Sequence, residues 1–245
     1  MTEGPATGTA PTVHLVGAGL GDLGSLTRRA VRLLGDADVV VLDRPSLDLV
    51  AALASPAAER VHVGRHPGHP AWSTDEVVAL LAERARAGLR VVRLKGGDPF
   101  VCSRGAEEAL ALAERGVAVD VTPGVTSTTA AGAASGMARG SSVTVASGNH
   151  DPAGPEVDWV TLGRVGPRSG AVVVLTGRAH QGQIAVGLVA GGRPADIEAA
   201  VVHGAGRTQQ AVSTVALADV RGVGLPPPAA MVVAPSPEGG PHAHP

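Results

Sequence analysis

The sequence predicts an α/β protein of two domains, and two observations carry that prediction. Short, fully apolar runs, such as residues 38–43, alternate with helix-like segments through roughly the first half of the chain. This alternation is typical of a parallel, doubly wound sheet with helices on both faces. The pattern changes after residues 122–129, where more strands than helices follow. We therefore expect a second, mixed α/β domain.

Composition sets the expected limits of these domains. The first residues are small and polar without the basic and apolar parts of a signal peptide, and the last ones are rich in proline, glycine and histidine. We expect a disordered lead at 1–11, an N-terminal α/β domain at 12–123, a C-terminal α/β domain at 124–235 and a disordered tail at 236–245.

Capping residues delimit the helices of the first half. Ser25 or Thr27 can cap the first helix, and Ser73 or Thr74, followed by two acidic residues, can cap the third. Glu107 and Glu108 fall in the first turns of the last helix, where the helix dipole favours negative charge. The expected strands are 13–16, 38–43, 61–63, 90–94 and 117–121. The first expected helix ends near 34, the second covers 47–53, the third ends at 88 and the fourth covers 107–115.

In the second half, apolar runs separated by glycines predict strands. Small side chains dominate residues 126–136, as expected of a helix that packs closely on another backbone. The strands expected after it are 142–146, 171–175, 199–202 and 229–234, with a helix over 183–189.

Charge and composition exclude several functional classes. The net charge of −2 leaves no basic footprint for nucleic acid or an anionic membrane, and one phenylalanine, two tryptophans and no tyrosine leave no platform for stacking bases. No apolar run reaches the length of a membrane span. The single cysteine, Cys102, fits a reducing cytoplasm. We expect a cytoplasmic protein without nucleic-acid or membrane partners.

The stretch 91–105 marks the most informative candidate site. An apolar, β-branched strand breaks on Gly96-Gly97-Asp98-Pro99 before a helix, and the carboxyl ends of strands are where open α/β sheets bind ligands. Lys95, the only lysine among the twenty Lys and Arg residues, precedes the break. Asp98 could accept hydrogen bonds from a ribose or an amino group, or it could simply cap the following helix.

A second glycine turn, with glycines at 17, 19 and 21, follows the first strand, and Asp43 closes the next one. Glycines allow close approach of a ligand, and an acid at the second strand end often binds a ribose. The third glycine of the dinucleotide fingerprint would fall at Asp22, so the match is incomplete. A nicotinamide-dependent oxidoreductase remains one reading.

A third turn, residues 122–127, ends the last strand of the first half. Its hydroxyls and free amides could bind a ligand, although Thr126 or Ser127 could equally well be an ordinary helix N-cap.

Three histidines between residues 62 and 69 do not indicate a metal site. His62, His66 and His69 fit no common zinc spacing and have no cysteine partners, so we expect no metal site. Arg65, in the same loop, is a better donor to carboxylates. Arg44 and Arg104 lie next to the proposed ligand turns and could instead be ordinary surface residues.

Taken together, these turns resemble the uroporphyrinogen-III C-methyltransferases of the tetrapyrrole methylase family. The string Arg-Leu-Lys-Gly-Gly-Asp-Pro-Phe at 93–100 is the most specific match, and residues 192–196 extend the resemblance over roughly 12–235. The matching segments, in the order and spacing of the family, are 16–22, 39–44, 91–100 and 121–127.

The resemblance implies a fold, a cofactor and a reaction. It implies a tetrapyrrole methylase fold, usually a homodimer, with S-adenosyl-L-methionine in the cleft between the domains and S-adenosyl-L-homocysteine as product. Members of the family methylate uroporphyrinogen III, a highly anionic tetrapyrrole, to precorrin-2, on the branch toward siroheme and cobalamin.

The resemblance also assigns roles to residues. Asp43 matches the proposed proton acceptor, and Arg65 stands where the family has its proton donor, normally lysine. As clamps for the substrate carboxylates we expect Arg44, Arg65, Arg104 and Arg139. The positions that match cofactor-contacting residues are Leu20, Gly96, Gly97, Asp98, Val101, Thr126, Ser127, Thr176 and Ala205.

Several of these positions depart from the family pattern. Leu20 replaces a proline, residues 102–103 replace an aromatic-glycine pair, Thr176 replaces a methionine, and the segment between 136 and 143 is shortened. These departures support an alternative interpretation, a catalytically weakened paralogue that binds the cofactor as a partner subunit or acts on another acceptor.

Overall fold

The computed structural model describes residues 10–64, 71–137, 140–149, 156–165, 170–175, 180–224, 226 and 229–235. It consists of two compact units, Met1–Thr126 and Ser127–Pro245, and the second begins with helix α5 (Ser127–Ser135).

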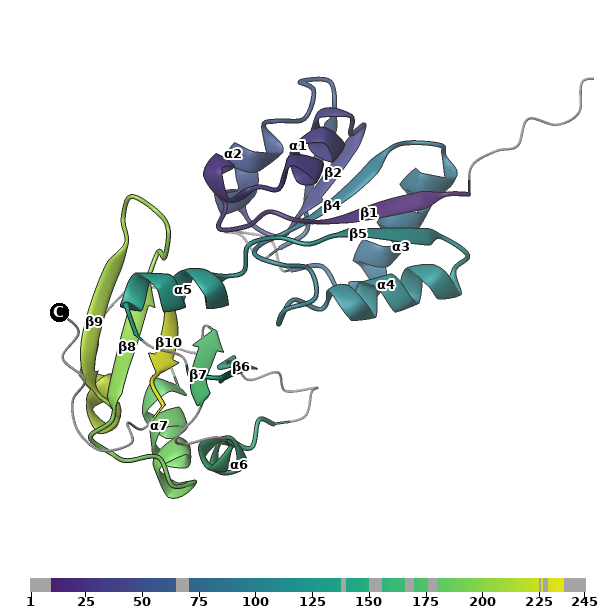
Figure 1. Cartoon of the computed structure of the whole chain (residues 1–245). Helices are drawn as coiled ribbons and strands as arrows, with labels where there is room; N and C mark the ends of the chain where they lie inside the picture. The colour runs from purple at the N-terminus through teal and green to yellow at the C-terminus, as the bar shows by residue number, and fades with distance from the viewer. Residues whose placement is uncertain are drawn as a thin grey trace, which may run out of the picture. The chain divides into compact units, whose positions relative to one another are not determined.

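The first unit is built on a five-stranded parallel sheet (Figure 1). Its strand order is β3-β2-β4-β1-β5, and every neighbouring pair is parallel. The doubly wound sheet predicted from the sequence is therefore confirmed. The strands are β1 (Thr12–Gly17), β2 (Val39–Leu42), β3 (Glu59–His62), β4 (Val91–Lys95) and β5 (Ala118–Thr122).

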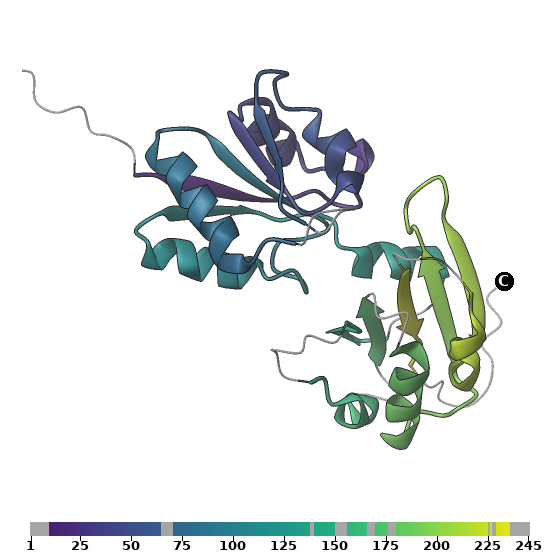
Figure 2. The same ribbon diagram turned by 180° about the vertical axis from the view of Figure 1, so that it is seen from behind.

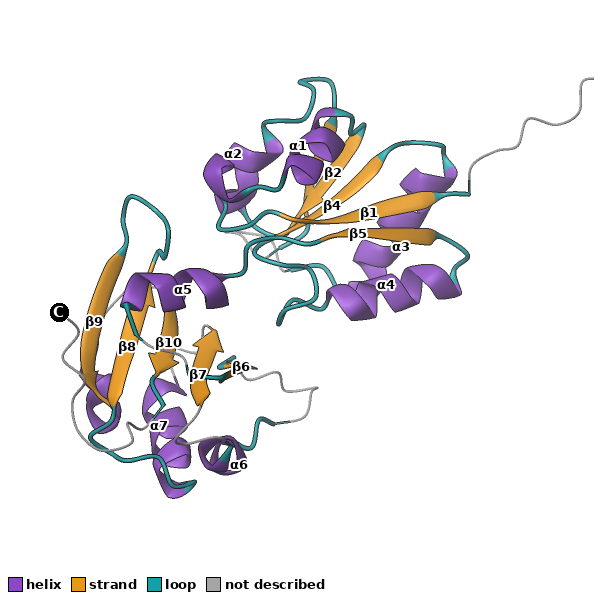
Figure 3. Ribbon diagram, in the orientation of Figure 1, coloured by secondary structure: helices purple, strands orange, loops and turns teal. Residues whose placement is uncertain are grey.

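Helices cover both faces of this sheet, which explains why β2 is apolar throughout and why every residue of β4 is buried. Helices α1 (Arg28–Gly35) and α2 (Asp48–Ala51) lie on one face, and α3 (Thr74–Arg86) and α4 (Gly105–Glu114) lie on the other (Figures 2 and 3). Successive side chains of a strand point to opposite faces. Val40 therefore packs in the core beneath α1 and α2, whereas Val41 packs in the core beneath α3 and α4.

The helix caps follow the sequence rules. The Thr27 side chain accepts a hydrogen bond from the Ala30 N–H, and Ser73 forms a capping box with Glu76. The limits of several elements differ by one to three residues from those expected. The third strand begins at Glu59 rather than at 61, and the last helix begins at Gly105 rather than at 107.

The connections of the first sheet define where a ligand could enter. The chain leaves β1 toward the face that carries α1, and it leaves the neighbouring strand β4 toward the face that carries α4. Adjacent strands whose connections diverge form a topological switch point, and ligands of open α/β sheets bind at the carboxyl ends of such strands.

The second unit contains a mixed five-stranded sheet, as predicted. Its order is β6-β7-β10-β8-β9; β6 and β7 are parallel, and the other neighbours are antiparallel. Helix α5 contacts one face, and α6 (Trp159–Arg164) and α7 (Gln181–Ala190) lie on the other. The strands are β6 (Ser142–Ser147), β7 (Gly170–Leu175), β8 (Glu198–His203), β9 (Ala211–Ala216) and β10 (Ala229–Val233).

Three elements of this unit were not expected from the sequence. Strand β9 alternates partly buried and exposed residues at the edge of the sheet, so it lacks the continuous apolar run that marks β7. Helix α6 has only six residues, and a 3-10 helix (Leu217–Gly222) follows β9. None of the helices formed by the described residues combines the length and apolar character needed to cross a bilayer.

We predict that an ion pair between Asp38 and Arg90, the residues directly before β2 and β4, stabilises the protein in a pH-dependent way. Hydrogen bonds from the side chain and the backbone N–H of Arg90 lower the pKa of Asp38 from 3.8 to about 2. This contribution is present above 3.8 and is lost as the pH falls through about 2. Asp38→Asn should therefore lower the melting temperature at neutral pH, and its difference from the unaltered protein should shrink over that acidic range.

The exposed neighbour Asp36 supplies the control. Asp36→Asn should not reproduce this pH-dependent difference in thermal unfolding, and an Asp38→Asn difference that stays constant with pH would contradict the account.

Candidate functional site

The glycine turns after β1, β4 and β5 lie against one another at the carboxyl edge of the first sheet. Gly19 and Gly97 pair as an isolated antiparallel bridge: the Gly97 N–H donates to the Gly19 carbonyl at 2.7 Å, and the Gly19 N–H donates back at 3.2 Å. Gly124, in the turn after β5, packs against Gly17 and Gly97. The bends that the sequence placed at separate strand ends thus form one surface.

This surface leaves no room for side chains at its centre. A Cβ atom added to Gly17 would lie 2.6 Å from the Gly124 nitrogen and 2.7 Å from the Gly97 carbonyl oxygen. Gly19 and Gly97 also adopt left-handed backbone conformations, with φ of 58° and 69°. Only glycine satisfies both requirements, so a ligand at this edge would meet backbone.

Asp98 holds two of these turns together. Its carboxylate accepts a hydrogen bond from the Phe100 N–H at 2.8 Å and another from the Gly124 N–H at 3.1 Å. The reading of Asp98 as a cap of the following helix is wrong, because α4 begins at Gly105 and Arg104 occupies its N-cap position. Asp98 instead fixes the spacing between the turns after β4 and β5.

The turn that leads into α4 is conformationally unusual. Cys102 and Arg104 adopt left-handed backbone conformations, with φ of 51° and 47°, which are rarely populated by residues other than glycine. Such conformations cluster at ligand sites. Val101 begins this turn, and its N–H donates to the Asp98 carbonyl at 3.4 Å.

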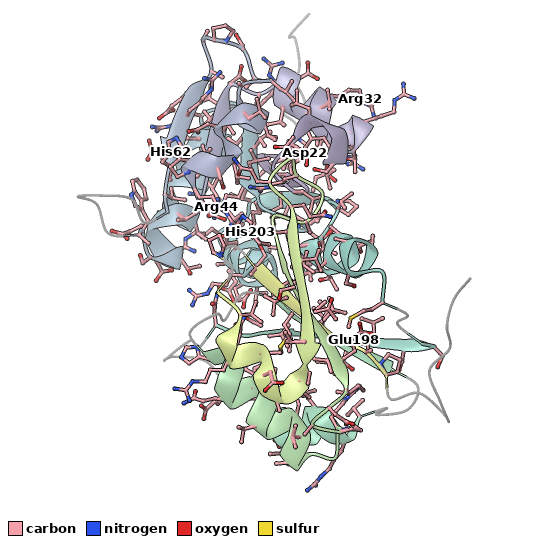
Figure 4. All side chains as sticks on the ribbon, turned by 90° about the vertical axis from the view of Figure 1, so that its left-hand side faces the viewer. Asp22, Arg32, Arg44, His62, Glu198 and His203 are labelled. Carbon is pink, nitrogen blue, oxygen red and sulfur yellow. The ribbon has the colours of Figure 1, made fainter. Side chains whose placement is uncertain are left out.

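Asp43 and Arg44 extend the edge on the side of β2. Figure 4 looks toward the carboxyl ends of the first sheet's strands and labels Arg44 and Asp22, from the segments after β2 and β1. The Arg44 guanidinium lies over Gly96, 2.5 Å from where a Cβ of that glycine would be. A Cβ on Gly64 would lie only 1.4 Å from the Asp43 carbonyl oxygen, so Gly64 lets the chain after β3 pass directly against Asp43.

A buried ion cluster lies behind this edge. Arg93 and Lys95 of β4 are 2% and 3% exposed, and Glu108 of α4 is 5% exposed. Glu108 accepts two hydrogen bonds from Arg93, at 2.9 and 3.0 Å, and one from Lys95 at 2.6 Å. The same Arg93 guanidinium also bonds to the Asp43 carboxylate. The cluster therefore joins the core to a half-buried acid at the sheet edge.

Burial and mutual charge shift the basic groups of this cluster in opposite directions. Burial, followed by the charge of Arg93, lowers the pKa of Lys95. Burial also acts to lower the pKa of Arg93, but the carboxylates of Asp43 and Glu108 outweigh it and raise that pKa above its usual value.

Sequence reasoning missed this cluster. It interpreted Glu108 by its favourable place in the helix dipole and took Lys95 as a marker of the ligand turn; the structure buries Lys95 against Glu108. A signal was present, because two cations separated by one residue in a strand buried on both faces share a face and need a buried acid.

The structure gathers many of the expected site residues at this edge. Those at or next to the glycine turns are Leu20, Asp43, Arg44, Gly96, Gly97, Asp98, Val101, Arg104 and Thr126. Ser127 is the first residue of α5, and Ala205 lies in the second unit, in the turn after β8. Arg65, Arg139 and Thr176 lie outside the described residues, as do His66 and His69.

His62 has a local partner. Its Nε2 lies 3.1 Å from an Asp48 carboxylate oxygen, which joins the end of β3 to α2. Within the part of the chain that the structure describes, no three His, Cys, Asp or Glu side chains come together as metal ligands would.

A parallel sheet whose glycine turns meet at a switch point, followed by a mixed-sheet unit, defines a class of α/β protein in which the carboxyl ends of the parallel strands are the usual place for a ligand. The family model of the tetrapyrrole (corrin/porphyrin) methylases matches residues 12–221. The chain belongs to this family, and the resemblance inferred from its motifs is confirmed.

Individual relatives refine this assignment. The chain is 40% identical over 231 residues to a uroporphyrinogen-III C-methyltransferase of Sinorhizobium sp., an alignment that spans 91% of the chain and 82% of the relative. It is 38% identical over 233 residues to the siroheme synthase of Chromobacterium violaceum, where 91% of the chain spans only 49% of the relative. The chain thus has about half the length of the siroheme synthases it matches.

A solved structure has the same architecture. The uroporphyrin-III C-methyltransferase of Thermus thermophilus, complexed with S-adenosylhomocysteine, is 37% identical, with a TM-score of 0.77. The match covers 91% of this chain and 97% of that one.

We predict that Gly17→Ala destabilises the first unit. The added methyl group would overlap the backbone of Gly124 and Gly97, so the glycine turns must separate, at a cost of about 1–3 kcal/mol or more in the free energy of unfolding. Gly35→Ala is the matched control. A Cβ at Gly35, the last residue of α1, meets nothing within 4 Å, so this change should stabilise by roughly 0.5–1 kcal/mol.

Urea unfolding of the two variants and the unaltered protein measures both effects. Equal stability of Gly17→Ala and Gly35→Ala would show that the turns do not need their close contact.

Proposed function

We propose that this protein uses S-adenosyl-L-methionine to methylate uroporphyrinogen III at ring carbons, giving precorrin-2 on the branch toward siroheme and cobalamin. The observation that carries the proposal is the side-chain-free surface formed by Gly17, Gly97 and Gly124. Similarity to named uroporphyrinogen-III C-methyltransferases over nine tenths of the chain supports it.

The residues at the sheet edge suit this cofactor. A nucleoside can approach the turns because no Cβ blocks them, and the turns lie at the carboxyl ends of β1 and β4. Bound there, S-adenosyl-L-methionine would supply an activated methyl group on a cationic sulfur. The residues proposed to hold it are Leu20, Gly96, Gly97, Asp98, Val101, Thr126, Ser127, Thr176 and Ala205.

Arginines next to the turns suit an anionic tetrapyrrole. Uroporphyrinogen III carries eight carboxylates, and guanidinium groups bind carboxylates through paired hydrogen bonds. Arg44 and Arg104 are exposed beside the glycine turns, and we assign them to this role together with Arg65 and Arg139.

Asp43 is proposed as the proton acceptor. An electron pair of the ring carbon forms the new carbon–carbon bond while the sulfur–methyl bond breaks, so the macrocycle gains a methyl cation equivalent and must lose a proton. The half-exposed Asp43 carboxylate can take that proton and later release it to water. Because the sulfonium is already activated, holding the reactants in line should supply much of the rate.

Arg65 stands where the family has its proposed proton donor. A guanidinium stays charged at any pH that the folded protein experiences, so it cannot donate a proton in turnover. We therefore give Arg65 a carboxylate-binding role in this protein.

The turn after β1 argues against a nicotinamide-dependent oxidoreductase. In dinucleotide-binding folds the glycine turn runs directly into a helix whose N-terminus faces the pyrophosphate. Here Asp22 takes the place of the third glycine and accepts a hydrogen bond from the Ser25 N–H, and a 3-10 helix (Leu23–Ser25) separates the turn from α1. A pyrophosphate site requires an α-helix that begins directly after the glycines, and in this protein α1 does not begin there.

A weakened paralogue is the second candidate, and the departures at Leu20 and Cys102 favour it.

We assign the protein to the cytoplasm as a homodimer, in keeping with the resemblance and with its single cysteine.

Incubation with labelled S-adenosyl-L-methionine and uroporphyrinogen III under anaerobic conditions tests the proposal. We expect the mass of the product to rise by two methyl groups while S-adenosyl-L-homocysteine accumulates. A weakened paralogue would bind S-adenosyl-L-methionine in calorimetry yet release no S-adenosyl-L-homocysteine. An oxidoreductase would bind NAD instead.

Two variants separate binding from chemistry in this assay. Asp98→Ala releases the turns after β4 and β5 from each other and should abolish cofactor binding, whereas Asp43→Asn should slow turnover with cofactor affinity nearly intact. Unchanged cofactor affinity in Asp98→Ala would refute the proposed pocket.

A further inference from the structure

The buried ion cluster in the first unit has an arrangement that the fold alone does not require. Side chains of β4 alternate between the two faces of the sheet, so Arg93 and Lys95 point to the same face as Val91, which packs beneath α3 and α4. Glu108, in the first turn of α4, meets them there. Apolar side chains of similar size would fill this space without the penalty of burying charge.

The geometry of Arg93 directs it toward the edge of the sheet. In the register of β2 and β4, Val41 lies opposite Arg93 and Leu42 lies opposite Leu94, so Asp43 follows one pair further along. The Arg93 side chain covers that distance, and its Nη2 atom bonds to both Glu108 and Asp43. Glu108 binds Nε and Nη2 of the same guanidinium, which fixes the plane of the group.

Among the described residues, Asp43 is held through one of its two carboxylate oxygens. Oδ1 bonds to Arg93, while Oδ2 has no hydrogen-bond partner among the described residues, and the side chain is 33% exposed. One oxygen is thus anchored from the core, and the carboxylate remains partly exposed at the edge of the sheet. Lys95 completes the charge balance, because two cations face two carboxylates.

Together these contacts lead us to propose that Arg93, held by Glu108 and Lys95, is a positioning residue that orients the Asp43 carboxylate for proton acceptance. This role rests on the proposed function, because Asp43 is assigned there as the acceptor. Arg93 does not touch the substrate; it acts through Asp43. Loss of the anchor would let the Asp43 side chain rotate, and displacement of a reacting group by about 1 Å can reduce a rate on the order of 10²-fold.

A double-mutant cycle between Arg93 and Asp43 tests the proposal. Arg93→Met keeps much of the volume of the side chain and should lower kcat on the order of 10²-fold, with KM for uroporphyrinogen III and Kd for S-adenosyl-L-methionine unchanged. In the Asp43→Asn background the same change should lower kcat no further, because the group that Arg93 orients is already lost. Where Arg93→Met does not fold, Arg93→Lys carries the cycle, since an ammonium cannot hold both carboxylates in the same plane.

Arg90→Met is the matched control. Arg90 immediately precedes β4, is exposed and pairs with Asp38 away from the cluster, so kcat should stay at the value of the unaltered protein. Glu108→Gln, which loosens Arg93 without touching Asp43, should reproduce the loss of kcat in part.

The outcomes distinguish the two claims. Equal losses of kcat from Arg93→Met in both backgrounds, or a loss that appears in KM and Kd instead, would overturn the positioning role and leave the proposed function standing. Absence of turnover by the unaltered protein would overturn the proposed function and this role with it.

Discussion

Contact between three backbone turns is the constraint on which the site depends. The turns after β1, β4 and β5 approach so closely that Gly17 and Gly124 have no space for a Cβ, and the Gly19–Gly97 bridge ties two of the turns together. Parallel strands bring their carboxyl ends to one edge, and glycine allows the segments beyond them to pack backbone on backbone. The result is a surface without side chains at the switch point of the sheet.

Charged side chains next to and behind this surface hold its parts in place. Asp98 sets the distance between two of the turns through paired N–H contacts, and Arg93 connects Glu108 in the core with Asp43 at the edge. Asp98 thus ties two turns to each other, whereas Arg93 places the Asp43 carboxylate through bonds that begin on a strand and a helix. A methyl transfer, whose reagent is already activated, gains most from such fixed geometry.

The sequence was sufficient for much of this fold and for only part of the site. Continuous apolar strands revealed the sheet of the first unit, because both of its faces are covered, whereas the half-exposed edge strand β9 carried no such signal. Glycine positions located the turns, but their mutual contact depends on the strand order, which spacing does not encode. Arg93 and Glu108 are fifteen residues apart and their pairing follows only from the register of α4 on β4. Asp98 was expected at the site from the sequence. Its bond to Gly124 could not be predicted, because it depends on the turn after β5 lying against the turn after β4.

Backbone hydrogen–deuterium exchange with and without S-adenosyl-L-homocysteine tests the central claim most directly. If the cofactor lies against the glycine turns, saturating ligand should slow exchange in peptides that span residues 17–21 and 96–101, and NAD at the same concentration should not. Binding of S-adenosyl-L-homocysteine that leaves exchange in both segments unchanged would contradict the account.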